Sequence, residues 1–178
     1  MCVFCGSSLG VRPAYEHAAR ALGAEIAGRG LRVVYGGAAV GLMGVLADAA
    51  LGAGGQVVGV IPQPLVDREV AHTGLTELRV TDSMHERKAL MAELADAFVA
   101  LPGGFGTLDE FAEILTWTQL GFQRKPCGLL NVAGFFDPLL TFFDHAAAEG
   151  FVRPGHRRLV TVDTDPARLF DTLAESAP

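Results

Sequence analysis

The stretch AFVALPGGFGTLDEFAEILTWTQLG, residues 97 to 121, contains a complete strand, loop and helix. A short apolar run leads into three glycines within four positions, and a longer segment with helical spacing of its apolar residues follows. The same order of apolar run, small residues and helical segment recurs along the whole chain. Such alternation predicts successive βαβ units with right-handed crossovers.

The predicted elements follow this alternation from one end of the chain to the other. The predicted strands cover residues 2–6, 31–37, 56–62, 97–104, 127–132 and 159–163, with a shorter edge strand at 76–80. The predicted helices cover residues 14–30, 41–55, 83–97, 107–121, 135–150 and 166–177. The strands are apolar throughout, which is typical of a sheet covered by helices on both faces. We therefore predict a Rossmann-like, doubly wound α/β fold with a mostly parallel sheet, in one domain spanning residues 1–178.

The composition argues against several classes of protein. Half of the 178 residues are hydrophobic and 19% are charged, as in globular chains. The net charge of −6 argues against nucleic acid as the main partner. No apolar run reaches the roughly 18 residues of a membrane span, and the first ten residues lack the basic segment of a signal peptide.

The cysteines and histidines predict neither a disulfide framework nor a metal site. Cys2, Cys5 and Cys127 are an odd number, which favours a reducing cytoplasm. Cys2 and Cys5 have C-x-x-C spacing, but residues three apart on a strand point to opposite faces. The five histidines have no ligand spacing with cysteines or carboxylates, so we expect no metal.

Glycine-rich loops follow three of the predicted strands, at residues 6–8, 35–44 and 102–107. Ligands of open α/β sheets bind beyond the carboxyl ends of the strands, where such loops meet. Each loop leads into a helix whose first amide groups lack an internal partner and attract anions. Three such loops indicate a nucleotide or sugar phosphate. The P-loop motif is absent and G-x-G-x-x-G is incomplete, so we expect neither a P-loop ATPase nor a nicotinamide dinucleotide site.

Arg87 lies on the apolar stripe of one predicted helix. Ser83 and Glu86 have the spacing of a capping box, which predicts where this helix begins. Met84 and Met91 lie three residues before and four after Arg87, on the same side of the helix. A guanidinium among core-facing residues needs a charged partner or a cavity. A buried ion pair and an arginine directed at a ligand both fit this pattern.

Glu110, just after the last glycine loop, also has two interpretations. Thr107 and Glu110 have capping-box spacing, and Asp109 in the first turn would favour the helix dipole. The alternative is a catalytic carboxylate one turn beyond a phosphate or sugar pocket. The position beside the glycine loop favours the catalytic interpretation.

Five motifs together resemble one known family. The motifs are PGGFGTLDE at 102–110, MHERK at 84–88, YGGAAVGLMG at 35–44, TWTQLG at 116–121 and KPCGLLNV at 125–132. They resemble the Lonely Guy, or LOG, family of cytokinin riboside 5′-monophosphate phosphoribohydrolases, many of them mislabelled lysine decarboxylases. The resemblance covers nearly the whole chain. One departure is Ala38, where the family loop more usually reads Y-G-G-G.

The resemblance implies catalytic roles for Arg87 and Glu110. It implies hydrolysis of the N-glycosidic bond of AMP or an N6-substituted adenosine 5′-monophosphate, giving the free base and ribose 5-phosphate without a cofactor. It also implies a homodimer. Together with the loops, it predicts these substrate-contacting residues: Ser8, Gly36, Gly37, Met43, Glu69, Met84, Lys88, Gly103, Gly104, Phe105, Gly106, Thr107 and Thr116. Glu69 lies in the longest irregular stretch, residues 62–75.

Other interpretations remain open at this point. The only lysines are Lys88 and Lys125, which argues against pyridoxal phosphate and a decarboxylase. The apolar segment 111–122, with Trp117 and Phe122, fits a partner interface and core packing equally well. One rival function is a molybdenum-cofactor carrier that binds without hydrolysis, which needs no catalytic carboxylate. Another is a hydrolase of purine monophosphates in general.

Overall fold

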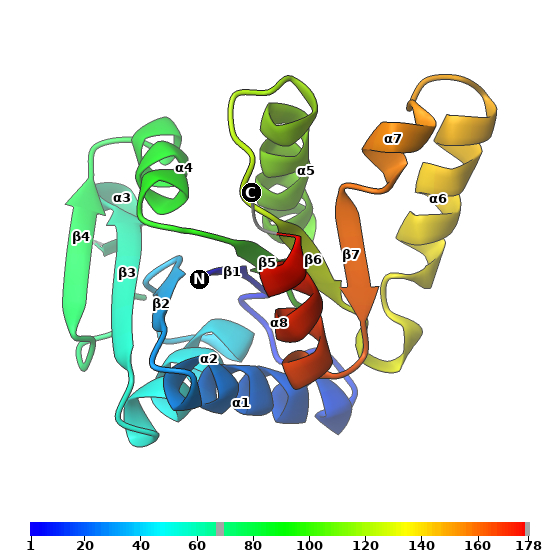
Figure 1. Cartoon of the computed structure of the whole chain (residues 1–178). Helices are drawn as coiled ribbons and strands as arrows, with labels where there is room; N and C mark the ends of the chain where they lie inside the picture. The colour runs from blue at the N-terminus through cyan, green and yellow to red at the C-terminus, as the bar shows by residue number, and fades with distance from the viewer. Residues whose placement is uncertain (67–69, 177–178) are drawn as a thin grey trace.

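The computed structural model describes residues 1–66 and 70–176. The strands are β1 Cys2–Phe4, β2 Arg32–Tyr35, β3 Gln56–Pro62, β4 Glu77–Thr81, β5 Phe98–Ala100, β6 Cys127–Leu130 and β7 Val160–Asp163. The helices are α1 Pro13–Gly28, α2 Gly41–Gly52, α3 Gln63–Val66, α4 Met84–Glu93, α5 Phe105–Gln119, α6 Asp137–Ala148, α7 Pro154–Arg157 and α8 Pro166–Glu175, with a 3₁₀ turn, η1, at Val132–Gly134. Figure 1 shows the strands in the middle of the molecule with helices above and below them.

The seven strands form one sheet in the order β4-β3-β2-β1-β5-β6-β7, and each neighbouring pair is parallel. The predicted Rossmann-like fold is therefore confirmed, including the edge position of the strand at 76–80. Strand order reverses at β1, which pairs with β2 on one side and β5 on the other. A crevice for a ligand is expected at the carboxyl ends of strands where the order reverses.

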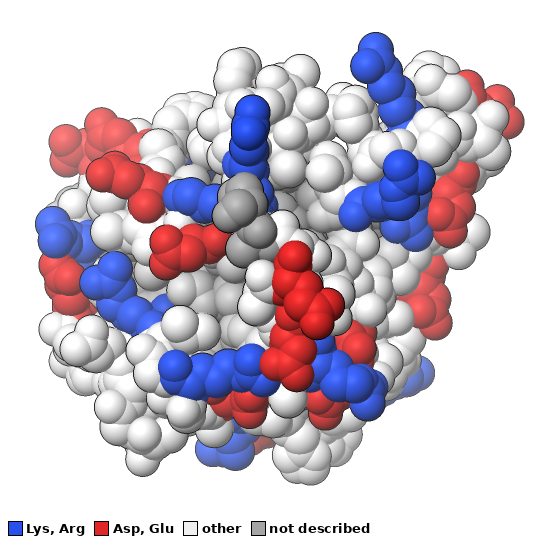
Figure 2. Space-filling view, in the orientation of Figure 1, with Lys and Arg blue, Asp and Glu red and all other residues white. Residues whose placement is uncertain are grey.

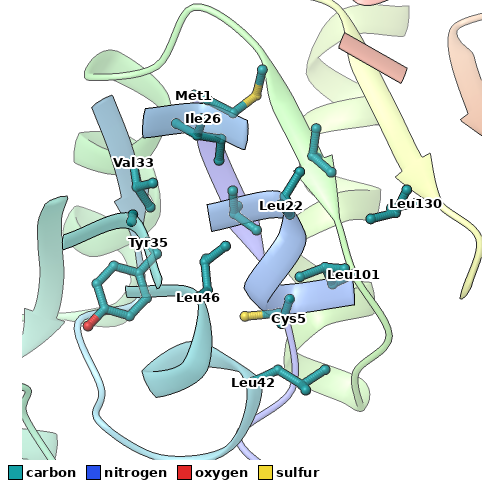
Figure 3. Packing of buried hydrophobic residues seen from close by; sticks show 14 of the residues in the cluster. Met1, Cys5, Leu22, Ile26, Val33, Tyr35, Leu42, Leu46, Leu101 and Leu130 are labelled. Carbon is teal, nitrogen blue, oxygen red and sulfur yellow. The ribbon is translucent and has the colours of Figure 1, made fainter. Parts of the chain in front are cut away.

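Two hydrophobic clusters cover the two faces of the sheet. One packs α1, α2 and α8 against it, with Leu22, Ile26, Leu46 and Leu169 fully buried. Figure 3 shows Leu22, Ile26 and Leu46 close together in this cluster. The other packs α4 and α5 through Met91, Phe111 and Ile114, with partly buried residues of α6 beside them. Burying both faces of the strands explains why they are apolar throughout.

Cys2 and Cys5 lie in different clusters, on opposite faces of the sheet, as their spacing predicts. Both are free, as is Cys127. No helix in the described ranges is long and apolar enough to cross a lipid bilayer. In the view of Figure 2, basic and acidic side chains are interspersed, with no large area of one sign.

The structure differs from the predicted elements mainly in its shortest helices. Helices α3 and α7 have four residues each, and neither was predicted because one turn carries no periodic signal. Helix α3 occupies part of the stretch 62–75 that was predicted to be irregular. Helix α5 begins at Phe105, two residues before the predicted start at Thr107.

Candidate functional site

A cavity of about 230 Å³ lies where the chain leaves the carboxyl ends of β1, β2 and β5. All three glycine loops line it, through Gly6, Gly36 and Gly104. Two charged side chains also line it, Arg87 from α4 and Glu110 from α5. The crevice expected at the reversal of strand order therefore exists, and among the described residues its wall carries one cation and one carboxylate.

Backbone contacts hold the loops around this cavity together. The Gly6 N–H donates to the Pro102 carbonyl at 3.0 Å, and the Leu42 N–H donates to the Gly6 carbonyl at 3.0 Å. Gly41 has a φ of 58° and lies against the backbone of Ser7, so a side chain has no room there. The loop after β1 is thus joined to the loops after β2 and β5.

The Arg87 guanidinium is held from two sides. Its Nη2 lies 2.9 Å from Glu110 Oε1, and both side chains are about nine-tenths buried. Its Nε donates to the Val60 carbonyl of β3 at 3.1 Å. Helix α4 begins as predicted, with the Ser83 hydroxyl accepting from the Glu86 N–H at 3.2 Å. Arg87 therefore forms a buried ion pair and also lines the cavity, while its direction toward a ligand stays a prediction.

The Glu110 carboxylate is largely buried and lies beside the Arg87 guanidinium. Burial raises the pKa of the Glu110 carboxyl above its ordinary value, and the nearby Arg87 charge only partly offsets this effect. A carboxylate with a raised pKa is a stronger base than one in water. The pair therefore provides a basic oxygen and a fixed positive charge at one point of the cavity wall.

The N-terminus of α5 provides amide donors at the same cavity. Gly104 is the N-cap residue and no side chain caps the helix there. The first N–H groups of a helix have no partner within it and attract anions. A Cβ on Gly104 or Gly106 would meet no atom within 4 Å, so the space beside both residues is open. Such an end of a helix suits a phosphate group.

The capping interpretation of Thr107 and Glu110 is wrong. Because α5 begins at Phe105, Thr107 is its third residue, and the Glu110 side chain pairs with Arg87. Asp109 is likewise beyond the first turn and pairs with Lys88, at 3.2 Å. The early start explains the error, since capping spacing assumed a helix that begins after Thr107.

Comparison with known proteins agrees with this geometry. A family model described as "Possible lysine decarboxylase" matches residues 43–173. A cytokinin riboside 5′-monophosphate phosphoribohydrolase of Rhodococcoides fascians is 56% identical over 164 residues, which cover 92% of this chain and 83% of the relative. An Arabidopsis thaliana protein of the same name is 49% identical over 178 residues, covering 100% of this chain and 82% of the relative. This chain belongs to the LOG family.

Solved structures of other proteins have a fold similar to that of this LOG protein. The molybdenum cofactor carrier protein of Chlamydomonas reinhardtii has a TM-score of 0.74 and 26% identity, covering 98% of this chain and 94% of that one. The molybdenum cofactor binding protein of Rippkaea orientalis has a TM-score of 0.74 and 24% identity, with the same coverage. The identity to the phosphoribohydrolases is about twice as high.

The residues predicted from the LOG resemblance fall into two groups. The first group lines the central cavity and consists of Gly36, Met43, Gly104, Phe105, Gly106 and Thr107, with Arg87 and Glu110. Ser8 and Gly103 line an adjoining cavity of about 230 Å³ that shares Gly6, Ser7 and Gly104 with it.

The second group lines neither of these two cavities and consists of the described residues Gly37, Met84, Lys88 and Thr116. The Met84 sulfur is 3.7 Å from Arg87 Nη1, and the Gly37 carbonyl accepts from the His72 N–H at 2.9 Å. Thr116 lines a separate cavity. It lies six residues beyond Glu110, which places it about 9 Å farther along α5 and away from the central cavity. Glu69 lies outside the described residues. The assignments in both groups stay predictions.

Of the described residues that line the cavity, four are missing from the predicted substrate contacts: Val3, Cys5, Gly6 and Ser7. The signal for Gly6 and Ser7 was present, because both follow the first strand in a small-residue loop. Nothing in the sequence marked Val3 and Cys5, which belong to a buried strand and its end. Ala38, the departure from the family loop, is 5% exposed and does not line the cavity.

Neither lysine of this LOG protein lines the central cavity. The Lys88 ammonium pairs with Asp109 and Glu113, and Lys125 donates to the Ala92 carbonyl at 2.8 Å. A Schiff base with pyridoxal phosphate needs a lysine that reaches the cofactor. The description "Possible lysine decarboxylase" therefore finds no support in this site.

Proposed function

We propose that this protein hydrolyses the N-glycosidic bond of adenosine 5′-monophosphates, with or without an N6 substituent, and releases the free base and ribose 5-phosphate. The observation that carries the proposal is the ion pair of Arg87 and Glu110, 2.9 Å apart on the wall of a cavity lined by the start of α5. Relatives about half identical over the whole chain bear the name of this activity.

The substrate phosphate binds the amide groups at the start of α5, from Gly104 to Thr107. Helix N-termini favour phosphate through these free N–H groups and the helix dipole. Ser7, on the loop after β1, lines the same cavity and adds its hydroxyl as a donor, whereas the Gly6 N–H is already bonded to the Pro102 carbonyl. The phosphate thereby places the ribose next to Glu110.

Breaking the bond between the ribose C1′ and the base leaves positive charge on the ribose and negative charge on the base. The Glu110 carboxylate stabilises the ribose charge, as carboxylates do in glycoside hydrolysis. Its raised pKa also suits it to accept a proton from the water that attacks C1′. Arg87 holds Glu110 in place and offsets charge on the departing base, but it is too basic to donate a proton.

The test is to incubate the purified protein with AMP and N6-isopentenyl-AMP and to measure free base by chromatography. We expect release by the unaltered protein, with a loss of about 10²–10³ in kcat for Glu110→Gln and for Arg87→Ala. The matched controls are Glu16→Gln and Arg20→Ala, which break an exposed ion pair on α1 and should keep full activity. No release from either nucleotide would contradict the proposal.

Two rival functions are separated by the same assay. A carrier like the molybdenum cofactor proteins would bind without releasing base, whereas a general purine hydrolase would act equally on GMP and IMP. The buried ion pair in the cavity wall favours hydrolysis over simple binding, because burying two charges is costly and adds little stability by itself. We expect base from the adenosine monophosphates and less from the other two.

We also propose a homodimer of single-domain chains. The apolar segment at residues 111–122 divides into two parts: Phe111 and Trp117 pack in the core, whereas Leu120 and Phe122 are 58% and 77% exposed. Phe142 of α6 is 61% exposed as well. The family resemblance implies the dimer, and an interface that covered these three side chains would remove their apolar surface from water. Light scattering should give twice the mass of the chain, and the double variant Phe122→Glu, Phe142→Glu should be a monomer.

The free cysteines support a cytoplasmic location.

A further inference from the structure

Lys88 lies next to Arg87 on α4, and its ammonium reaches α5 instead of the cavity. Its Nζ lies 3.2 Å from Asp109 Oδ2 and 3.1 Å from Glu113 Oε2. The Lys88 side chain is only 13% exposed, so it is enclosed between its two partners and the protein. Lys88 is not among the residues that line the central cavity.

Neighbouring residues of α4 thus bind neighbouring residues of α5. Arg87 pairs with Glu110. Lys88 pairs with Asp109, which precedes Glu110 in the sequence, and with Glu113, which lies one helical turn after Glu110. Successive helix residues point about 100° apart. A rotation of α5 that turned Glu110 away from Arg87 would therefore also pull Asp109 and Glu113 away from Lys88.

This arrangement gives Lys88 a task distinct from that of Arg87. We propose that Lys88 is a positioning residue: by binding Asp109 and Glu113 it fixes the rotation of α5 that directs the Glu110 carboxylate at Arg87. The inference rests on the proposed hydrolysis, in which Glu110 acts on the ribose. It differs from the substrate contact that the family resemblance implies for Lys88. Two carboxylates of α5 already bind its ammonium, and the side chain is largely buried.

Positioning and substrate contact predict opposite results when the acidic partners are removed. In the double variant Asp109→Asn, Glu113→Gln, a positioning lysine loses its anchors and Glu110 loses its alignment. A lysine that binds phosphate would instead be released from competing carboxylates and would bind ribose 5-phosphate more tightly. Asp109 and Glu113 are 63% and 28% exposed, so their replacement leaves the core intact.

The experiment compares Lys88→Met, Lys88→Arg and the double variant with the unaltered protein. Calorimetry with ribose 5-phosphate gives its affinity and the fraction of competent sites, and kcat is expressed per competent site. We expect kcat to fall about tenfold or more in Lys88→Met and in the double variant, since small misalignment of a catalytic group has effects of this size. The affinity for ribose 5-phosphate should stay within about twofold in both. Lys88→Arg keeps the charge and should restore most of kcat.

A nearly unchanged kcat in Lys88→Met would overturn the inference. So would a large loss of ribose 5-phosphate affinity in Lys88→Met together with normal kcat in the double variant. If Lys88→Met does not fold, the double variant decides alone: a fall in kcat supports positioning, and normal kcat overturns it. Failure of the proposed function is distinguishable, because the unaltered protein would then release no base.

Discussion

Gly36 lies so close to Arg87 that a Cβ on Gly36 would collide with the Nη2 of the guanidinium. The same Nη2 is the atom that contacts Glu110. The Met43 sulfur would be 3.2 Å from that Cβ and closes the other side. The absence of a side chain at residue 36 therefore provides the space in which the ion pair forms.

Gly36→Ala should displace the Arg87 guanidinium and lower kcat about a hundredfold, because catalytic groups tolerate little displacement. Gly52→Ala is the matched control, since a Cβ there meets nothing within 4 Å and lies at the exposed end of α2. We expect the control to keep full activity. Base release by both variants is the measurement, and equal rates would show that Arg87 is not placed by this contact.

Gly104→Ala should weaken nucleotide binding without unfolding the protein. Its methyl group would project into open space beside the first amides of α5, where the phosphate is proposed to bind. We expect KM to rise about tenfold or more with a smaller effect on kcat, as when binding common to the ground and transition states is lost. Gly28→Ala, also with open space around the Cβ, is the control. A normal KM would place the phosphate elsewhere.

The activity should fall at acidic pH because Glu110 must be ionised to stabilise the ribose charge. Burial raises the pKa of its carboxyl, so protonation begins at a higher pH than for a glutamate in water. We therefore expect the acid limb of kcat/KM above the ordinary value of about 4.3. The profile from about pH 4 to about pH 8 tests this. A limb at or below the ordinary value, or one that persists in Glu110→Gln, would assign it to another group.

Ser83→Ala should destabilise the protein by about 1 kcal/mol, because it removes the side-chain cap of the helix that carries Arg87 and Lys88. A loss of this size lowers Tm by about 2–4 °C in a chain of this length. Ser176→Ala is the control, since Ser176 is exposed at the end of α8 and its hydroxyl donates to the Thr172 carbonyl. Thermal melting compares the two variants. An equal Tm for both would show that the Ser83 cap does not contribute to stability.

Local patterns in the sequence determined a large part of the fold by themselves. All seven strands and the six longer helices lie where apolar runs and helical spacing predict them. The cap at Ser83 and the opposite directions of Cys2 and Cys5 were also predictable. These features depend on residues a few positions apart, whose relative directions are set by strand and helix geometry.

Only the tertiary structure decided what Glu110 and Lys88 contact. The spacing from Thr107 allowed Glu110 to cap its helix as well as to act in a pocket, and the family resemblance predicted a substrate contact for Lys88. The strands that precede α4 and α5, β4 and β5, lie four positions apart in the sheet. The two helices nevertheless meet on the same face of the sheet, and this packing determines both contacts. Contacts between residues more than about 20 positions apart depend on how the whole sheet is assembled. Hydrophobic periodicity reports only on residues a few positions apart, so it could not predict these contacts.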